Sequence, residues 1–381
     1  MANSFVTAKE IAERALPHLV ERIKMLPLVN AGAYDGAFKK SGDVIQVKKP
    51  LRGNTADGSG DISGSYADVA DESVQITLDQ QRTYPVSLSS KEMTLNVDDF
   101  DRQVIVPAVT KLAEDINNSL LGLYVDIPYF YGVAGTTPDA LKDLAQGRKI
   151  LQDNLAPMMD RSFVMDSEAE AAFLELDSFA EVDKSGTNQA LREAALGRVY
   201  GMTLASDSMI AAHTAGTYSA LTDLTSDGVQ TIGATTLNIE SAAGTSTGTV
   251  LKGDIFTIET GAAAGQYVAT ANATAASGDV AVSIYPALRG ATADTDTIAF
   301  ADETAGAHVP NLMFQKDAFT LAMAPLEAPR GGADAAVINF GGFSIRVVND
   351  YLFTTDKNVI RFDVLYGVKT TYPELACRVI G

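Results

Sequence analysis

The chain has 381 residues, of which 46% are hydrophobic, and it carries a formal net charge of −19. This apolar content is enough to form a core, so the composition excludes an intrinsically disordered chain. An acidic protein repels phosphate backbones, which argues against sequence-specific binding of nucleic acid.

The length predicts two to three domains, at about 150 residues each. Cys377 is the only cysteine, so no internal disulfide can form. The sequence has no apolar run of about 18 residues. Its first residues, MANSFVTAKE, lack the basic and apolar regions of a signal peptide. We therefore expect neither a membrane span nor a cleaved signal.

Residues 4–26 have the periodicity of an amphipathic helix. Thr7 and Glu10 have the spacing of a capping box at its start, and Pro17 should kink it. Its apolar face consists of Ile11, Ala15, Leu19 and Ile23. The helix either covers its own domain or forms an arm that docks on a neighbouring chain.

Residues 42–88 predict a long β-hairpin. Val44 and Val47 alternate with polar residues on the first strand, and Val74 and Ile76 do so on the second. The segment between them, LRGNTADGSGDISGS, is rich in Gly, Ser and Asp. Such a tip cannot bury apolar area, so it should project from the domain.

Residues 98–125 carry the longest helical pattern. Its apolar positions step by four: Val104, Ala108, Leu112, Ile116, Leu120 and Tyr124. A helix of this length spans about 40 Å at about 1.5 Å per residue. The acidic residues at its start suit the positive end of a helix dipole.

Residues 138–212 alternate between helix and strand patterns. TPDALKDLAQGRKILQDNL and SEAEAAFLELDSF predict helices, and RSFVMDSE between them predicts a short buried strand. Val199, Met202 and Leu204 mark a further strand.

Residues 222–306 differ in composition, because Thr, Ala, Gly and Ser dominate and only Lys252 and Arg289 are basic. Five short strand patterns predict a small all-β barrel or sandwich: TTLNIES, DIFTIET, QYVATAN, DVAVSIY and TIAFA. The best core candidates are Phe256, Ile258, Tyr267, Val280, Val282, Ile284, Tyr285, Leu288, Ile298 and Phe300. The segment lies between two α/β stretches, so we interpret it as an inserted domain.

The last residues, 359–381, alternate with period two. Ile360, Phe362, Val364 and Tyr366 fall on one face of a strand, and Arg361 falls on the other. After a turn at Tyr372-Pro373, the residues Leu375, Cys377 and Val379 alternate again. Chain ends usually fray, so this pattern predicts a terminal strand held within a sheet.

The motifs that could carry catalysis are weak. GTSTG at 244–248 matches the Gly-x-Ser-x-Gly nucleophile elbow through Ser246, and Asp294, Asp296 and His308 follow in the chain order of hydrolases. An elbow needs a strand-to-helix turn, whereas β-like sequence follows here. A serine hydrolase using Ser246 stays an alternative, and we predict no catalytic residue.

Ligand motifs are equally weak. The glycine-rich stretch 53–64 has neither GxGxxG nor a Walker lysine, and as a calcium loop it has Ile62 where the turn glycine belongs. His18, His213 and His308 lack the spacing of a metal site. We predict no cofactor-binding residue, no metal ligand and no cofactor.

The order of these segments resembles the major capsid proteins of tailed bacteriophages, which have the Hong Kong 97-type fold. The stretches that carry the resemblance are RTYPVSLSSKEMTLNVDDF, LAEDINNSLLGLY, DRSFVMDSEAEAAFLEL, ALREAALGRVYGMTLASDSMI and GGFSIRVVNDYLFTTDKNVIRFDVLYGVKTTYPELACRVIG. The threonine-rich segment resembles the β-barrel domain inserted in coat proteins of some short-tailed phages.

The resemblance implies an α+β fold of five parts. These are an N-terminal helical arm (1–41), an extended hairpin loop (42–88), a peripheral domain with a spine helix and C-terminal strands (89–127 and 343–381), an axial domain (128–221 and 307–342) and an inserted β-barrel (222–306).

The resemblance also implies a function. The chain would be a non-enzymatic major capsid protein that self-assembles, through a procapsid, into the icosahedral head around double-stranded DNA. It would form hexamers and pentamers with a scaffolding protein and a portal protein, assemble in the bacterial cytoplasm and remain in the virion. Neither sequence-specific nucleic-acid binding nor a membrane is expected. No lysine–asparagine pair can be placed, although Lys48 and Lys49 lie near the hairpin, so we predict no covalent crosslinks.

Three alternatives remain open at this point. One is an encapsulin-type nanocompartment shell of the same fold, which encloses cargo enzymes. A second is the serine hydrolase. A third is a threonine-rich β-protein of a cell surface, which the missing signal peptide disfavours.

Overall fold

In the computed structural model, part of the chain is described. The described residues are 8–31, 44–48, 73–89, 104–181, 192–194, 196–219, 221, 223–241, 247–302, 306–329, 334–340, 343–352 and 354–381. They form two compact units. Unit 1 comprises 1–23, 31–116 and 321–371, and unit 2 comprises 24–30, 117–320 and 372–381.

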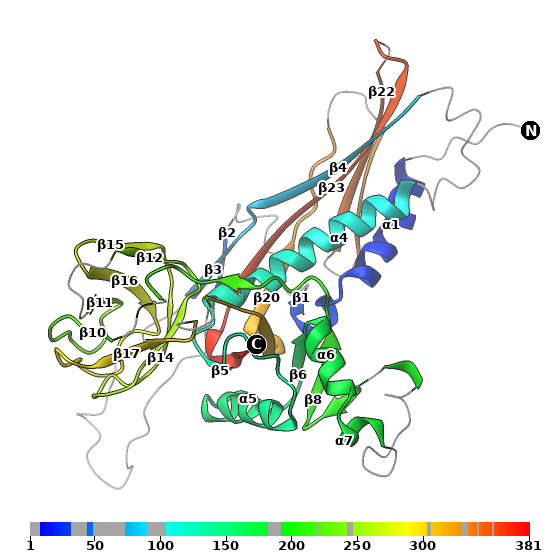
Figure 1. Ribbon diagram of the computed structural model, residues 1–381. Coiled ribbons are helices and arrows are strands. Elements are labelled where there is room, and N and C mark those ends of the chain that lie inside the picture. The colour runs from blue at the N-terminus through cyan, green and yellow to red at the C-terminus, as the bar shows by residue number, and fades with distance from the viewer. Residues whose placement is uncertain are drawn as a thin grey trace, which may run out of the picture. The chain divides into compact units, whose positions relative to one another are not determined.

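Unit 1 is built on long antiparallel strands (Figure 1). β23 (Lys357–Thr370) pairs on one side with β22 (Phe343–Leu352) and on the other with β4 (Gln80–Ser89), and β22 pairs with β21 (Asp334–Phe340). β20 (Phe319–Met323) and β1 (Asn30–Ala31) continue this sheet beyond β23.

The predicted alternation of β23 is confirmed. Ile360, Phe362, Val364 and Tyr366 are buried, and Arg361 is exposed. Asp363, on the face of Arg361, is also buried, which the alternation did not indicate. Gly367 has no room for a side chain, because a Cβ there would collide with the backbone carbonyl of Thr77.

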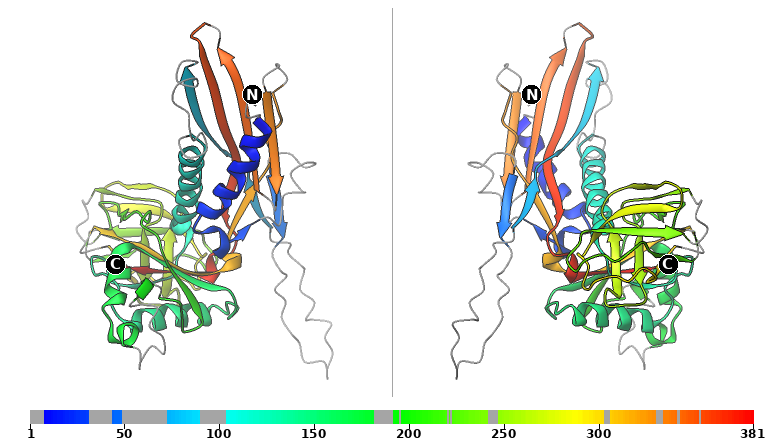
Figure 2. Two further views of the ribbon diagram at one scale, coloured as in Figure 1. Left: turned by 90° about the vertical axis from the view of Figure 1, so that its right-hand side faces the viewer. Right: turned by 90° about the vertical axis from the view of Figure 1, so that its left-hand side faces the viewer.

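The N-terminal helix, α1 (Ala8–Arg22), contacts β21 and β22 with its apolar face (Figure 2). The predicted face is confirmed, since Ile11, Ala15 and Leu19 are buried. The helix is shorter than the predicted 4–26, because it ends at Arg22 and a 3-10 turn, η1 (Leu26–Leu28), follows with Pro27 in it. Thr7 lies outside the described residues. The first helical amide, of Ala8, instead donates to Asp334 Oδ2 at 3.0 Å.

The predicted long helix corresponds to α4 (Val106–Leu121). A π-helical turn at Val104–Ile105 precedes it, and the 3-10 segment η3 (Gly122–Asp126) follows it. Its buried stripe matches the predicted spacing through Ala108, Leu112, Ile116 and Leu120. The regular helix spans about 24 Å at about 1.5 Å per residue, which is shorter than expected. Residues 98–103, the expected start, lie outside the described part.

The two hairpin strands also pair as expected. β2 (Val44–Lys48) and β3 (Ser73–Thr77) are antiparallel, with Val47 opposite Val74. Residues 49–72, which include the glycine-rich stretch and Lys49, lie outside the described residues, and nothing is described of the Lys48 side chain.

Unit 2 contains a mixed six-stranded sheet in which the end of the chain is an interior strand. The order is β5 (Phe130–Gly132), β24 (Ala376–Ile380), β19 (Pro310–Gln315), β6 (Arg161–Met165), β8 (Met202–Ser206) and β7 (Arg198–Val199). All five residues of β24 are buried, so the predicted terminal strand is confirmed. The turn at Tyr372-Pro373 is the 3-10 segment η5 (Pro373–Leu375).

Three helices pack on this sheet: α5 (Leu141–Asp153), α6 (Ser167–Leu174) and α7 (Asp177–Ala180). Leu144 and Leu151 of α5, and Phe173 of α6, share one core with the strand residues Phe163 and Cys377. Asp166 begins α6 by accepting hydrogen bonds from the amides of the helix's first turn. The thiol of Cys377 is fully buried, which raises its pKa well above the ordinary value and keeps it protonated.

Unit 2 also holds a closed six-stranded barrel. Its strands are β10 (Leu224–Ser226), β11 (Thr236–Ser241), β16 (Asp279–Tyr285), β14 (Gly265–Ala269), β13 (Ile255–Ile258) and β17 (Thr297–Phe300), and β17 pairs with β10. Each of the five predicted strand patterns overlaps one of these strands, and β10 was not predicted. All the predicted core residues are buried in the barrel core except Tyr285, which is half-buried and packs elsewhere.

Two further strand pairs lie next to the barrel in the sequence. β12 (Gly248–Val250) pairs with β15 (Ala273–Ala275), and β9 (His213–Thr214) pairs with β18 (Ala307–His308). The sequence patterns missed these strands because two or three residues show no periodicity.

The two units divide the chain differently from the expected domain boundaries. Residues 321–342, expected in the axial part, belong to unit 1, because β21 pairs with β22. Residues 372–381, expected in the peripheral part, belong to unit 2, because β24 lies between β5 and β19.

Candidate functional site

Two histidines that are far apart in the sequence lie opposite each other in unit 2. His213 and His308 are partners in the β9–β18 pair, and their ring centroids are 5.1 Å apart. This pair stands where the chain leaves the mixed part of unit 2 for the barrel and where it returns. Both imidazoles are buried, so they belong to the interior of the protein.

Each histidine has its own carboxylate. His213 Nε2 lies 2.8 Å from Asp254 Oδ1, and its Nδ1 lies 3.0 Å from the hydroxyl of Tyr124. The second oxygen of Asp254 accepts from the amides of Gly216 and Leu251, at 3.1 and 2.8 Å. His308 Nδ1 lies 2.8 Å from Asp302 Oδ1. These bonds satisfy carboxylates that burial would otherwise strongly destabilise.

Arg378, in the interior strand β24, completes this cluster. Its guanidinium is fully buried, donates from Nη1 to the carbonyl of Gly253 at 2.8 Å and lies 5.3 Å from the centre of the Tyr124 ring. Burial lowers the pKa of Arg378 to about 10, which nearby Tyr124 and the carboxylates of Asp302 and Asp254 partly oppose. The side chain is therefore charged at neutral pH.

We name the set Tyr124, His213, Asp254, Asp302, His308 and Arg378 the buried charge cluster. It joins the barrel to the mixed sheet, together with three exposed or half-buried contacts: Lys252 with Asp126 at 3.1 Å, Arg289 with the Tyr129 hydroxyl at 3.0 Å and Tyr285 with Glu374 at 3.3 Å. The sequence analysis missed it because no motif spacing links Tyr124, His213 and Arg378, which lie far apart in the sequence.

The cluster does not form a hydrolase site. The partner of His308 is Asp302, whereas Asp294 accepts from the amide of Gly228 and Asp296 from that of Ala293. Ser246 lies outside the described residues. His308 is 1% exposed, so no substrate reaches it. Among the described residues, no group of three or more His, Cys, Asp or Glu side chains could hold a metal ion.

The cluster predicts a loss of stability in mild acid. Burial has the largest effect on the pKa of His308 and lowers it, Asp302 opposes that effect, and Arg378 and His213 lower the pKa further, so that it lies below its ordinary value. Below about pH 6.5 the unfolded chain binds a proton that the folded chain does not, so the free energy of unfolding should fall as the pH falls. The slope is at most about 1.4 kcal/mol per pH unit for one proton.

Denaturant unfolding of the wild type and of His308→Gln between pH 5 and 7.5 tests this expectation. The variant should be less stable at pH 7.5, where Asp302 loses a partner, and should show a flatter pH dependence. Equal slopes in the two proteins would exclude His308 as the titrating group.

A second buried ionic group lies in unit 1, around Asp363. Arg346 Nε donates to its Oδ2 at 3.0 Å, while Arg361 Nε and the Thr83 hydroxyl donate to its Oδ1 at 2.6 and 2.7 Å. Burial raises the pKa of Asp363, but the hydrogen bonds from Arg361, Thr83 and Arg346 outweigh that effect and hold the pKa below its ordinary value. The group cross-links β4, β22 and β23.

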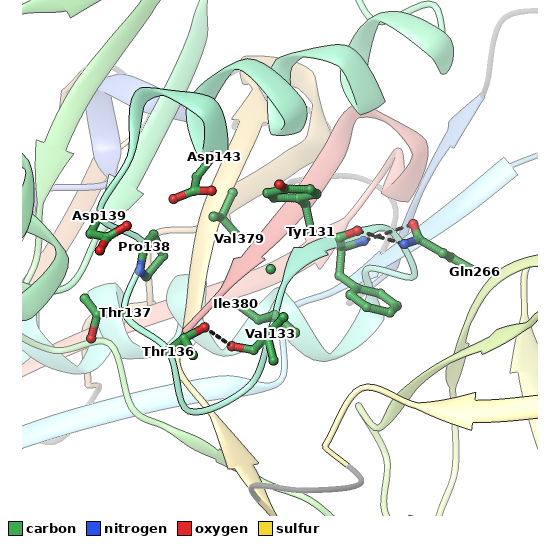
Figure 3. A pocket seen from close by; sticks show the side chains of 12 residues that line it. Tyr131, Val133, Thr136, Thr137, Pro138, Asp139, Asp143, Gln266, Val379 and Ile380 are labelled. Atoms are coloured by element: carbon green, nitrogen blue, oxygen red, sulfur yellow. Dashed lines mark hydrogen bonds between the residues drawn. The ribbon is translucent and has the colours of Figure 1, made fainter. Parts of the chain in front are cut away.

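The surface of unit 2 has a pocket of about 410 Å³ beside the start of α5. Figure 3 shows Tyr131, Val379 and Ile380 among its lining residues, with the carboxylates of Asp139 and Asp143 on one side. Gln266 lines the opposite side, where its amide donates to the Phe130 carbonyl at 2.7 Å and accepts from the Phe130 amide at 3.2 Å. The sequence analysis named Val379 only as part of the C-terminal strand, and it predicted no pocket here.

Comparison with known proteins places this fold. Residues 244–381 match the family model described as P22 coat protein, gene protein 5. Comparison with curated proteins finds no match. A chain of Mycobacterium phage Che8 has the same fold, with a TM-score of 0.52 and 12% identity over 92% of this chain and 89% of that one.

Two further structures are more distant. The capsid of cyanophage P-SCSP1u has a TM-score of 0.45 and 11% identity, covering 89% of this chain and 83% of that one. A virus-like particle from Pyrococcus furiosus has a TM-score of 0.41 and 8% identity, covering 97% of each chain. Scores below 0.5 support no functional conclusion. Within the described residues, no helix is long and apolar enough to cross a membrane.

Proposed function

We propose that this chain is a phage major capsid protein that forms the head shell, with the organisation of the Hong Kong 97-type capsid proteins. The match of residues 244–381 to the P22 coat protein carries this assignment. The mixed α/β fold shared with the Che8 chain supports it. The protein is structural and acts through its interfaces.

The proposed function also implies how copies of the chain assemble and what the shell encloses. Copies of the chain form hexamers and pentamers of an icosahedral shell, with a scaffolding protein and a portal protein, in the bacterial cytoplasm. The shell encloses double-stranded DNA. A net charge of −19 suits this role, because an acidic wall repels the packaged polymer instead of adsorbing it.

Electron microscopy of the purified protein in negative stain tests this function. We expect closed shells of uniform size, and phage particles should contain nuclease-protected DNA. Shells that enclose a protein cargo and no DNA would instead support the encapsulin-type alternative. A protein that stays monomeric under all conditions, including with its scaffold, would contradict both.

We propose that the barrel is an inserted domain, with the expected range 222–306 extended at both ends to 213–308. Tyr218 is fully buried in the barrel core and donates its hydroxyl to the Gly278 carbonyl, so it belongs to the barrel although it precedes residue 222. The pairing of β9 with β18 supports the wider limits.

Expression of two fragments tests these domain boundaries. Fragment 213–308 should fold alone, with dispersed amide NMR peaks, whereas fragment 222–306 lacks Tyr218 and should be less stable. Loss of a buried aromatic side chain costs about 3–5 kcal/mol. If both fragments give random-coil spectra, the barrel depends on its host and is not an autonomous domain.

A further inference from the structure

One edge of the sheet in unit 1 is a long exposed strand. β4 lies along β23 (Figure 1), and within the described residues no second strand pairs with its other side. It consists of the ten residues Gln80–Ser89. An open edge of this length presents a row of amides and carbonyls to which a strand of another chain can add.

The side chains of β4 give this edge little protection. None of those from residue 80 to residue 88 is buried. Arg82 is the only charged residue of the strand, and it precedes the stretch TYPVSL, residues 83–88. Apart from its proline, this stretch has the composition of segments that aggregate as β-structure, because it is rich in β-branched and aromatic residues and contains neither charge nor glycine.

Pro85 interrupts the outer side of this strand. A proline has no amide hydrogen and cannot donate to a neighbouring strand. The pairing of β4 with β23 nevertheless passes through Pro85, which lies opposite Arg361, with an unbroken register. Successive residues of an antiparallel pair direct their backbone groups alternately toward the partner strand and away from it. Position 85 is therefore one whose amide would point away from β23, toward the open edge.

The ring of Pro85 obstructs the same edge. Its Cδ atom stands in the place of the amide hydrogen, so it projects to where an added strand would run. The other residues of β4 that share this outward direction are Gln81, Thr83, Ser87 and Ser89. Pro85 thus divides the outer edge into two parts with two outward-directed residues each, and each part is shorter than a typical strand pairing.

The central position of Pro85 identifies a second copy of this chain as the partner that it excludes. Two identical edge strands pair antiparallel around a twofold axis, so that the same residues meet from both sides. In the two longest registers that match outward-directed residues, Pro85 lies opposite either Pro85 or Thr83 of the other copy. Both registers bring the two proline rings to the centre of the contact, where they obstruct it most.

We propose that Pro85 prevents folded copies of this chain from joining edge to edge through β4. The excluded partner is the β4 strand of a second copy. The pairing of β4 with β23 does not itself require a proline at this position, since an exposed amide can bind water instead. The inference concerns the single folded chain and does not depend on the proposed function.

Replacement of Pro85 by threonine tests this role in the full-length protein. Threonine favours strands, and its side chain would take an exposed position. After refolding from urea by dilution, we expect Pro85→Thr to leave about threefold more protein than the wild type in low-speed pellets that bind thioflavin T. The excess should increase with protein concentration. Ser87→Thr is the matched control, because it adds the same side chain at another exposed, outward-directed position and keeps Pro85, so it should behave as the wild type does.

Two further measurements separate an opened edge from a misfolded chain. Pro85→Thr/Ser87→Lys places a charge on the opened edge, which should return the pelleted fraction to that of the wild type. In the soluble Pro85→Thr protein, hydrogen exchange should be fast at the new amide of position 85 and slow at Tyr84 and Val86, whose amides point toward β23. A wild-type level of aggregation in Pro85→Thr, a failure of Ser87→Lys to reduce it, or slow exchange at position 85 in the monomer would overturn the proposal.

Discussion

Phe362→Asp is expected to prevent unit 1 from folding and to leave the protein in the insoluble fraction. Phe362 is fully buried in β23, opposite Val347 of β22 and Tyr84 of β4. A buried carboxylate without a partner costs several kcal/mol, as much as the whole stability of many domains. The measurement is the soluble fraction after expression, followed by urea unfolding of any soluble protein.

Two controls fix the interpretation of this result. Phe362→Leu keeps an apolar side chain and should remain soluble, with a loss of about 1–2 kcal/mol. Arg361→Ala should also remain soluble, because its side chain is 45% exposed and Asp363 keeps Arg346 and Thr83 as partners. If Phe362→Asp and Arg361→Ala had the same solubility, burial on one face of β23 would not determine the stability of unit 1.

Arg378→Met is expected to give the second large loss of stability, about 3–5 kcal/mol. The substitution removes a buried cation that interacts electrostatically with the buried carboxylates of Asp254 and Asp302. It also removes the bond to the Gly253 carbonyl, which ties the barrel to β24. Methionine has a similar length, so the loss reflects charge and hydrogen bonding more than volume.

A double-mutant cycle with Asp302→Asn makes this prediction specific. If Arg378 stabilises the fold by balancing buried acids, the double variant should recover part of the loss, with a coupling of about 0.5–3 kcal/mol. Urea unfolding at pH 7.5 measures all four proteins. Strictly additive losses would mean that Arg378 acts through packing alone.

Local patterns predicted the elements and their faces. The period of four in α4 and the period of two in β23 each identify buried residues, because burial against one neighbour imposes that spacing. The barrel strands could be recognised from the sequence in the same way, and the predicted core residues of the barrel are correct apart from Tyr285. Tyr285 directly follows the buried Ile284, so the alternation of β16 places it on the outer face, where its hydroxyl contacts Glu374.

Long-range polar contacts could not be predicted in this way. The Arg346–Asp363 bond depends on the register between β22 and β23, which a single strand pattern does not specify. His213 and His308 meet only because β9 pairs with β18. The pocket combines residues of β5, β14, β24 and the start of α5, and no motif connects these four segments.

The pairing of β9 with β18 has a consequence for how this protein can be altered. Paired strands hold their residues about 5 Å apart, so the segment between them begins and ends at neighbouring points. A foreign domain whose own ends lie close together could take the place of the barrel without displacing β6, β19 or β24. The lost bonds of Gly253 and Gln266 to Arg378 and Phe130 would need replacement partners on that guest. The protein thus offers a defined position at which antigens or enzymes could be displayed on every copy of the chain.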